Sequence, residues 1–223
     1  MKKGSDWVEA LIKDVGSIVL QQWGIIILIT IVILLLTKNL SVVPKKKSQS
    51  IIEIFVEGIS NWVRTTMGDQ YTGFSAYIGS LALFLFFMNV TDLLGFTPPT
   101  ANYSVALVLS LTTFFMVQIN SIIKNGGIGY LKGYASPSAA LLPINILERI
   151  MLPVTLSFRL FGNITVATVI IELLLKALGN FTWFAQFAIP VPFMAYFDLF
   201  DGLLQTFIFT ILTMIYIKMT AEE

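Results

Sequence analysis

Arg159 constrains how this chain can fold more than any other residue, because it interrupts a long apolar stretch. Apolar runs continue on both sides of the segment from Leu156 to Asn163 that contains it. A charged side chain near the centre of a bilayer costs roughly 2.5–3.5 kcal/mol on insertion scales. No carboxylate lies three or four residues away, so we expect its partner on another helix or subunit. The sequence therefore predicts a membrane protein that handles charge.

The composition agrees with this class. Apolar residues make up 56% of the 223 residues and charged residues only 12%, whereas about 25% is usual for a soluble domain. The net charge of +1 and the lack of a basic cluster interleaved with aromatic residues argue against nucleic-acid binding. The chain has no cysteine and no histidine, which excludes disulfides and removes the side chain that titrates near neutrality. Proton chemistry must then use carboxylates, water and Arg159.

The apolar runs predict an all-α integral membrane protein with a single membrane domain over residues 1–223. About five helices should cross the bilayer, and one amphipathic helix should lie on its surface. We expect the last two spans to form a long, tilted hairpin, because a helix over 145–178 would be ~50 Å long against a hydrocarbon core of ~30 Å. The expected segments are 18–37 for the first span, 49–67 for the surface helix, and 74–94, 103–123, 145–178 and 188–219 for the other spans.

The basic residues predict the orientation, because Lys and Arg are in excess in cytoplasmic loops. We expect the N-terminus outside and the C-terminus in the cytoplasm. In this orientation, nine basic residues lie on or near the cytoplasmic face: Lys38, Lys45, Lys46, Lys47, Arg64, Lys124, Lys132, Arg149 and Lys218. Four lie outside: Lys2, Lys3, Lys13 and Lys176.

Polar residues form two stripes along the segment 145–178 when they are placed at 100° per residue. One stripe contains Thr155, Arg159 and Asn163. The other, on roughly the opposite face, contains Thr165, Thr168, Glu172 and Lys176. We expect a membrane helix with two polar faces to separate two compartments. One face would present Arg159, and the other would line a wet, acidic route.

The last span carries Asp198, Asp201 and Gln205 on one face. In an antiparallel hairpin, Gln205 approaches the level of Arg159 and Asn163. Asp198 then lies about two turns nearer the outside, close to Thr168 and Glu172.

Three blocks of the sequence stand out: Asn89-x-x-Asp92-Leu93-Leu94-Gly95, the run from Pro153 to Asn163, and the segment 204–217 with Leu204-Gln205 and Tyr216. Together they resemble the a subunit of bacterial F-type ATP synthase. The resemblance covers about residues 81–221 and implies the stationary half of an ion-driven turbine in the bacterial plasma membrane. It also implies the partners: a rotating ring of c subunits, the b subunits of the peripheral stalk, the rest of the ATP synthase, membrane lipid, and protons or sodium ions.

The resemblance also implies roles for individual residues. The family's arginine, asparagine and glutamine correspond to Arg159, Asn163 and Gln205, and an acid of its third helix to Asp92. Arg159 would stabilise the charged ring carboxylate and block direct leakage between two offset half-channels. The acids Asp92, Glu172, Asp198 and Asp201 would concentrate cations at the outer entry.

The chain departs from the family pattern at the outer entry. Asp198 stands where the family often has Glu or His, Thr168 at the paired position, and Asp201 where the family is usually apolar. We therefore expect Asp198 to carry the relay and Asp201 to contribute less. Snorkelling of Glu172 and Asp201 toward outer water is as reasonable an interpretation as channel lining, and Asp92 could instead cap its helix.

Other functions remain open at this point. Asn163 and Gln205 could simply join two helices by a hydrogen bond. A secondary ion transporter would also place charges in the membrane, but the Arg159 block has no second copy in the sequence. A membrane insertase would not need three polar residues on one face of the last span. No nucleotide-binding loop is present, so we expect no cofactor, no metal site and no catalysis by this chain.

Overall fold

The computed structural model describes residues 3–38, 47–91, 98–134, 138–179 and 188–222. All regular elements in these ranges are helical, which confirms the all-α class. The α-helices are α1 (Lys3–Thr37), α2 (Lys47–Met67), α3 (Ser75–Val90), α4 (Tyr103–Gly133), α5 (Leu142–Leu178), α7 (Pro190–Ala195) and α8 (Gly202–Glu222). The 3-10 helices are η1 (Asp69–Phe74), η3 (Pro99–Ala101) and η4 (Ala139–Leu141), and η5 (Tyr196–Asp201) is a π-helix.

Four helical stretches of the described chain are long and apolar enough to cross a membrane. They are Asp69–Val90, Tyr103–Tyr130, Leu142–Leu178 and Pro190–Glu222. The expected first span lies within α1, where the apolar stretch Val19–Leu35 is shorter than these four. The chain is thus a multi-pass membrane protein.

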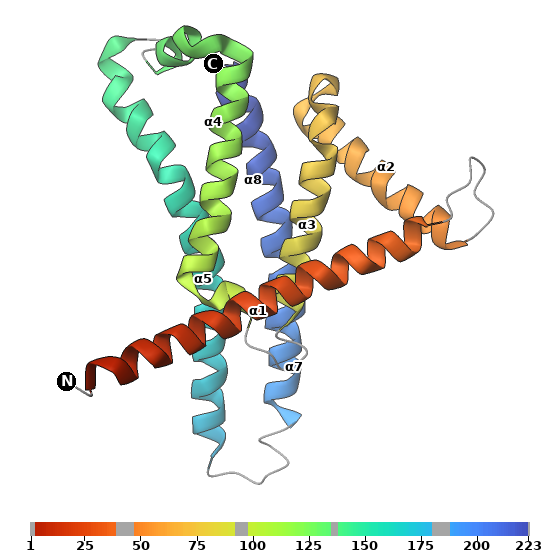
Figure 1. Ribbon diagram of the computed structural model, residues 1–223, viewed down its shortest axis with the longest axis vertical. Helices are drawn as coiled ribbons and strands as arrows, with labels where there is room; N and C mark the ends of the chain where they lie inside the picture. Colours follow the sequence, from red (N-terminus) through yellow and green to blue (C-terminus); the bar gives the residue numbers. More distant parts are fainter. Residues whose placement is uncertain (1–2, 39–46, 92–97, 135–137, 180–187, 223) are drawn as a thin grey trace.

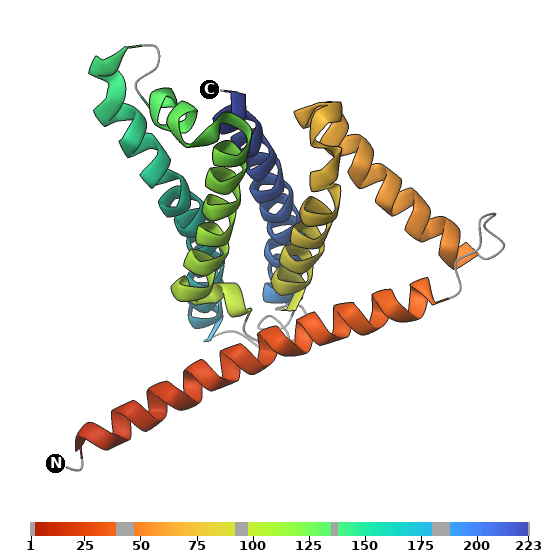
Figure 2. The ribbon, with the colours of Figure 1, turned by 45° about the horizontal axis from the view of Figure 1, so that its top comes forward.

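The helices α3, α4, α5 and α8 run side by side (Figure 1). Helix α1 crosses this bundle obliquely, and α2 leads back toward the start of α3 (Figure 2). Helix α5 runs antiparallel to α7 and α8, and this hairpin extends past the ends of α3 and α4 (Figure 1). The C-terminus lies at the same end of the molecule as the connection between α4 and α5.

Two buried clusters hold the bundle together. The first joins α2, η1, α3, α4 and α8 through Val63, Met67, Tyr71, Ile78, Val117, Met214, Ile217 and Ala221. The second holds α5 against α3, α4 and α8 through Leu81, Leu85, Ala106, Leu152, Leu156, Leu160 and Phe209. Because Leu156 and Leu160 flank Arg159 on α5, the second cluster fixes the rotation of α5 and hence the position of Arg159.

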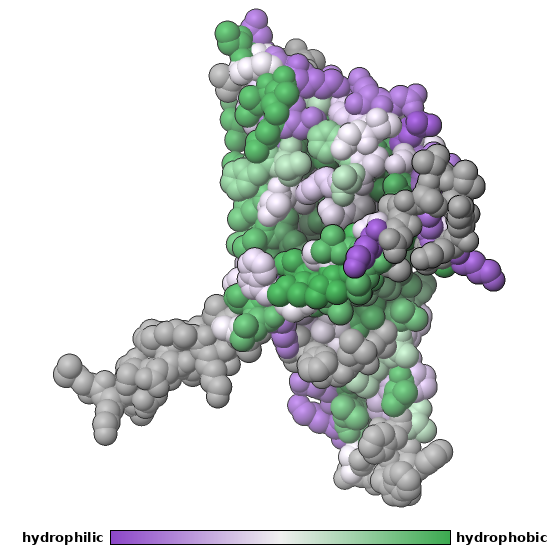
Figure 3. Space-filling model, turned by 45° about the vertical axis from the view of Figure 1, so that its right-hand side comes forward, coloured by the Kyte–Doolittle hydropathy of each residue, from purple (hydrophilic) through white to green (hydrophobic). Residues whose placement is uncertain are grey.

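On the face drawn in Figure 3, hydrophobic side chains cover the left side and much of the middle, and many hydrophilic ones gather toward the upper right. Helix α2 has an exposed apolar face, since Ile51, Ile54 and Phe55 are exposed while Val63 and Met67 are buried. A helix with one buried end and an exposed apolar face suits the surface of a bilayer.

Several boundaries differ from those that the sequence predicts. Helix α4 continues past residue 123 because Gly126, at φ 69°, allows a kink after which the helix resumes to Gly133. Helix α5 begins at Leu142 rather than at residue 145. The last span changes to a π-helix over Tyr196–Asp201 before α8 begins, a local feature that hydrophobic periodicity does not report.

Candidate functional site

Arg159 is half-buried on α5 between the fully buried Leu156 and Leu160. Among the side chains that the structure describes, no carboxylate lies within 4.0 Å of its guanidinium group. Two ion pairs among the described residues lie elsewhere, between Arg64 and Asp69 at 2.8 Å and between Lys176 and Glu172 at 4.0 Å. A permanent cation in an apolar bundle therefore stands without a described counter-ion.

Asn163, one turn after Arg159, joins α5 to α8. Its Nδ2 donates a hydrogen bond of 2.8 Å to Oε1 of Gln205. Gln205 is only 3% exposed, and its Nε2 has no hydrogen-bond partner among the described residues. The helical spacing predicts this meeting of Gln205 with the Asn163 level, and the bond confirms it.

Asn89 ties α3 to the start of α8. Its Nδ2 donates to the carbonyl oxygen of Gly202 at 3.2 Å and to Oγ1 of Thr206 at 3.3 Å, and its Oδ1 accepts from Oγ1 of Thr100 at 3.4 Å. The approach is close, because a Cβ atom added to Gly202 would lie 3.1 Å from Cβ of Asn89. Sequence reasoning quoted Asn89 only as part of a motif, although an amide late in an apolar span is a signal of interhelical bonding.

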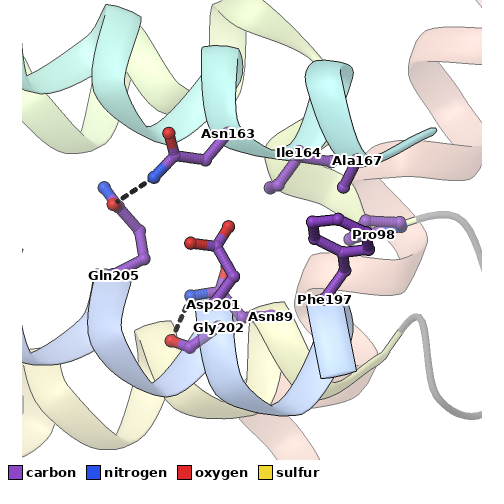
Figure 4. A pocket seen from close by; sticks show the side chains of 9 residues that line it. All are labelled: Asn89, Pro98, Asn163, Ile164, Ala167, Phe197, Asp201, Gly202 and Gln205. Atoms are coloured by element: carbon purple, nitrogen blue, oxygen red, sulfur yellow. Dashed lines mark hydrogen bonds between the residues drawn. The ribbon is translucent and has the colours of Figure 1, made fainter. Parts of the chain in front are cut away.

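These residues surround a small polar cavity between α3, α5 and the start of α8. Its walls are Asn89, Pro98, Asn163, Ile164, Ala167, Phe197, Asp201, Gly202 and Gln205. Figure 4 shows the carboxylate of Asp201 projecting into the space between α5 and α8. We call this space, on the far side of Asn163 from Arg159, the distal cavity.

A second polar cavity lies toward the other end of α5. It is lined by Gln118, Asn145, Glu148, Arg149, Leu152, Tyr216, Met219 and Thr220, and we call it the proximal cavity. The guanidinium group of Arg149 lies 4.2 Å from the ring centre of Tyr134 and 5.5 Å from that of Tyr130. The hydroxyl of Tyr130 in turn donates to Oε1 of Gln118 at 2.8 Å. Sequence reasoning missed this cluster and used Arg149 only as a topology signal.

Arg159 separates the two cavities along α5. The residues of α5 that line the proximal cavity end at Leu152, and those that line the distal cavity begin at Asn163. At 1.5 Å per residue these two positions are about 16 Å apart along the helix axis. Between these two positions on α5, Arg159 is the only charged residue in the sequence.

The other predicted site residues are less closely gathered. Thr155, Thr168 and Glu172 are exposed on α5, and Oγ1 of Thr168 donates to the carbonyl oxygen of Ile164 at 2.9 Å. Asp198 lies in the π-helix η5, but its side chain is outside the described part of the structure, and Asp92 lies outside the described residues altogether. No group of three or more acidic residues that could hold a metal ion occurs among the described residues.

The fold and the site define a multi-pass helical membrane protein whose last long hairpin places an arginine between two polar cavities. The family model described as ATP synthase A chain matches residues 19–218. The chain therefore belongs to this family, the a subunits of the membrane sector of ATP synthase.

Individual relatives agree with this assignment. The chain is 32% identical to ATP synthase subunit a of Moorella thermoacetica over 90% of its own length and 88% of the relative's. It is 36% identical to ATP synthase subunit a of Nitratiruptor sp. over 86% of its length and 83% of the relative's. It is also 32% identical to the sodium ion specific subunit a of Propionigenium modestum, over 90% and 72% of the two lengths.

Proposed function

We propose that this chain is the stationary ion-conducting subunit of an F-type ATP synthase, in which two half-channels carry protons or sodium ions to and from the carboxylates of a c-subunit ring. The observation that carries the proposal is the position of Arg159, half-buried between two polar cavities and without a described counter-ion. A counter-ion supplied in turn by each passing subunit of the ring would complete this arrangement.

The two cavities support the division into half-channels. The distal cavity would belong to the outer half-channel and the proximal cavity to the inner one. A fixed cation between them repels a cation that approaches from either side. An ion could then cross only by binding to the ring and riding around it, and each elementary charge that crosses 100 mV supplies about 2.3 kcal/mol.

Arg159 would also set the charge state of the ring carboxylate. A carboxylate that arrives from lipid is neutralised by its ion, because a bare charge is costly in hydrocarbon. Beside a guanidinium group the charged form is favoured, so the ion is released. The ring would thus be loaded on one side of Arg159 and unloaded on the other.

The exposed face of α5 supports a large partner on this helix. Only 6% of the most apolar 18-residue stretch of α5 is buried inside the structure, against 44% of the corresponding stretch in the span Pro190–Glu222. Phe158 and Val166 are each 57% exposed on α5, and no atom lies within 4 Å of a Cβ added to Gly162. We assign this face to the c ring, and the remaining outer surface to lipid and the b subunits of the peripheral stalk.

The acidic residues would serve the outer half-channel. Asp92, Glu172, Asp198 and Asp201 lie on or after segments that we place toward the outside, where anionic groups concentrate cations. In this orientation the N-terminus is outside and the connection between α4 and α5 is cytoplasmic. The subunit itself performs no catalysis; ATP is made by other subunits.

Replacement of Arg159 tests the proposal. In the complete ATP synthase reconstituted into vesicles, Arg159→Ala should abolish ion-driven ATP synthesis and permit ion leakage through the membrane sector. Arg64→Ala is the matched control, because Arg64 pairs with Asp69 on the exposed surface at the end of α2 and should leave synthesis intact. Coupled synthesis by assembled Arg159→Ala enzyme would refute the role of Arg159.

Co-purification tests the assignment of partners. The tagged subunit, extracted in mild detergent, should bring with it a ring of small helical-hairpin proteins and the peripheral stalk. A secondary transporter or an insertase would not. Recovery of a functional transporter without any ring would therefore argue against the whole proposal.

A further inference from the structure

We propose that Asp201 is the last carboxylate of the outer half-channel and that it passes the ion to the ring through water held in the distal cavity. This inference rests on the proposed function. It assigns the step to Asp201, whereas from the sequence we expect Asp198 to carry it.

The first support is the size and chemistry of the distal cavity. The volume of the cavity that water can occupy is about 20 Å³. One ordered water molecule needs roughly 10–15 Å³ together with polar partners. Among the described residues that line it, Asp201 is the only one with an ionisable side chain. Its carboxylate projects into the cavity between α5 and α8 (Figure 4).

The second support is that Asn163 and Asn89, two of the amides that line the cavity, donate to groups other than Asp201. Nδ2 of Asn163 donates to Gln205, and Nδ2 of Asn89 donates to Gly202 and Thr206. No hydrogen bond or ion pair from another described residue reaches the carboxylate of Asp201. A half-buried carboxylate without a protein partner needs water or a cation to offset its desolvation.

The third support is the position of the cavity relative to Arg159. Asn163, which forms one wall, lies one helical turn from Arg159 on the same stripe of α5. The charged residue nearest along this stripe is therefore Arg159 itself, whereas Glu172 and Lys176 point from the opposite stripe and pair with each other. An ion that leaves Asp201 has only the Asn163 wall between it and the level at which the ring meets Arg159.

The local backbone also marks this position. Asp201 ends the π-helix η5, and Gly202 begins α8 against Asn89. A π-helical turn changes the rotation of the residues before it relative to those after it, and such turns often occur at functional sites. Asp201 lies one turn before Gln205, so it stays on the face that meets α5.

The step is balanced in protons. A proton that arrives from outer water binds a carboxylate oxygen of Asp201 and neutralises it. The same proton then leaves through the cavity water to the ring carboxylate, which becomes neutral as Asp201 regains its charge. If the ion is sodium, the Asp201 carboxylate binds it as an oxygen ligand and releases it to the ring without any covalent change.

The test is passive ion conduction by the membrane sector in vesicles, with assembly verified on the same samples. Asp201→Asn keeps the size of the side chain and removes its charge, and it should lower conduction about tenfold or more, as expected for loss of an anion that focuses cations. Asp201→Glu should restore much of the conduction. Glu57→Gln, on the exposed surface of α2, is the matched acid-to-amide control and should conduct normally.

Conduction by assembled Asp201→Asn within twofold of wild type would overturn the inference. If that variant does not assemble, conduction by Ala167→Val tests the inference instead. The added methyl groups fill the cavity, and no charged residue is replaced. Reduced conduction then supports the inference, and normal conduction refutes it. Failure of the proposed function is distinct: wild-type vesicles would conduct no ions, or Arg159→Ala would remain coupled.

Discussion

Asn163 and Gln205 are 42 residues apart in the sequence and are joined by a hydrogen bond of 2.8 Å between α5 and α8. This bond fixes the register of the hairpin at the level next to Arg159. Gln205 is only 3% exposed, and Asn163 is half-buried.

A double-mutant cycle should detect this bond. Asn163→Ala, Gln205→Ala and the double variant should show a coupling energy of about 0.6–1.7 kcal/mol, the range found for hydrogen bonds between membrane helices. The measurement is denaturant-induced unfolding of the purified subunit in detergent. Strictly additive effects of the two single replacements would mean that the bond contributes nothing to the hairpin.

Gly202 should not tolerate a side chain. A Cβ atom there would lie 3.1 Å from Cβ of Asn89, so Gly202→Ala should push α3 from α8 and destabilise the fold by about 1–3 kcal/mol, as overpacking does. Gly58→Ala is the control, since nothing lies within 4 Å of its added Cβ and alanine favours the helix. The same unfolding experiment compares them, and equal stability of the two variants would contradict the close packing of Asn89 on Gly202.

Asp198→Asn should slow passive ion conduction strongly while leaving assembly with the ring intact. The reason is its place in the resemblance, where the family often has Glu or His, and the lack of a histidine to share the work. The sequence alone predicts a smaller effect for Asp201→Asn and an intermediate one for Glu172→Gln, whereas the distal cavity predicts a large effect for Asp201→Asn. Ion conduction measured for all three variants in parallel vesicles decides which replacement has the largest effect. Normal conduction by Asp198→Asn would show that Asp198 does not lie on the ion path.

The orientation can be tested by single cysteines, because the natural chain has none. A cysteine that replaces Lys46 or Lys124 should react with an impermeant reagent only from the cytoplasmic side, since Lys and Arg favour that side. A cysteine that replaces Lys13 should react only from the outside. Labelling of the cysteine at position 46 from the outside of intact cells would show that the orientation is the reverse of the predicted one.

The sequence alone determined the class of protein and the general place of the site. Long apolar runs can be satisfied in a bilayer by helices, so the spans around 74–94 and 145–178 followed from composition and length. The 3.6-residue period placed Asn163 beside Arg159 and brought Gln205 to the same level, because both relations are local to a single helix or to a simple hairpin.

Only the tertiary structure decided which polar groups meet between helices. Asn89 contacts Gly202 across 113 residues, Arg149 faces the rings of Tyr130 and Tyr134, and Asp201 lines the distal cavity. Each of these contacts depends on the kink at Gly126, on the π-helix before α8 or on the packing of α3 against α8. Such features arise from the fit of side chains between elements far apart in the chain, and helical periodicity carries no information about that fit.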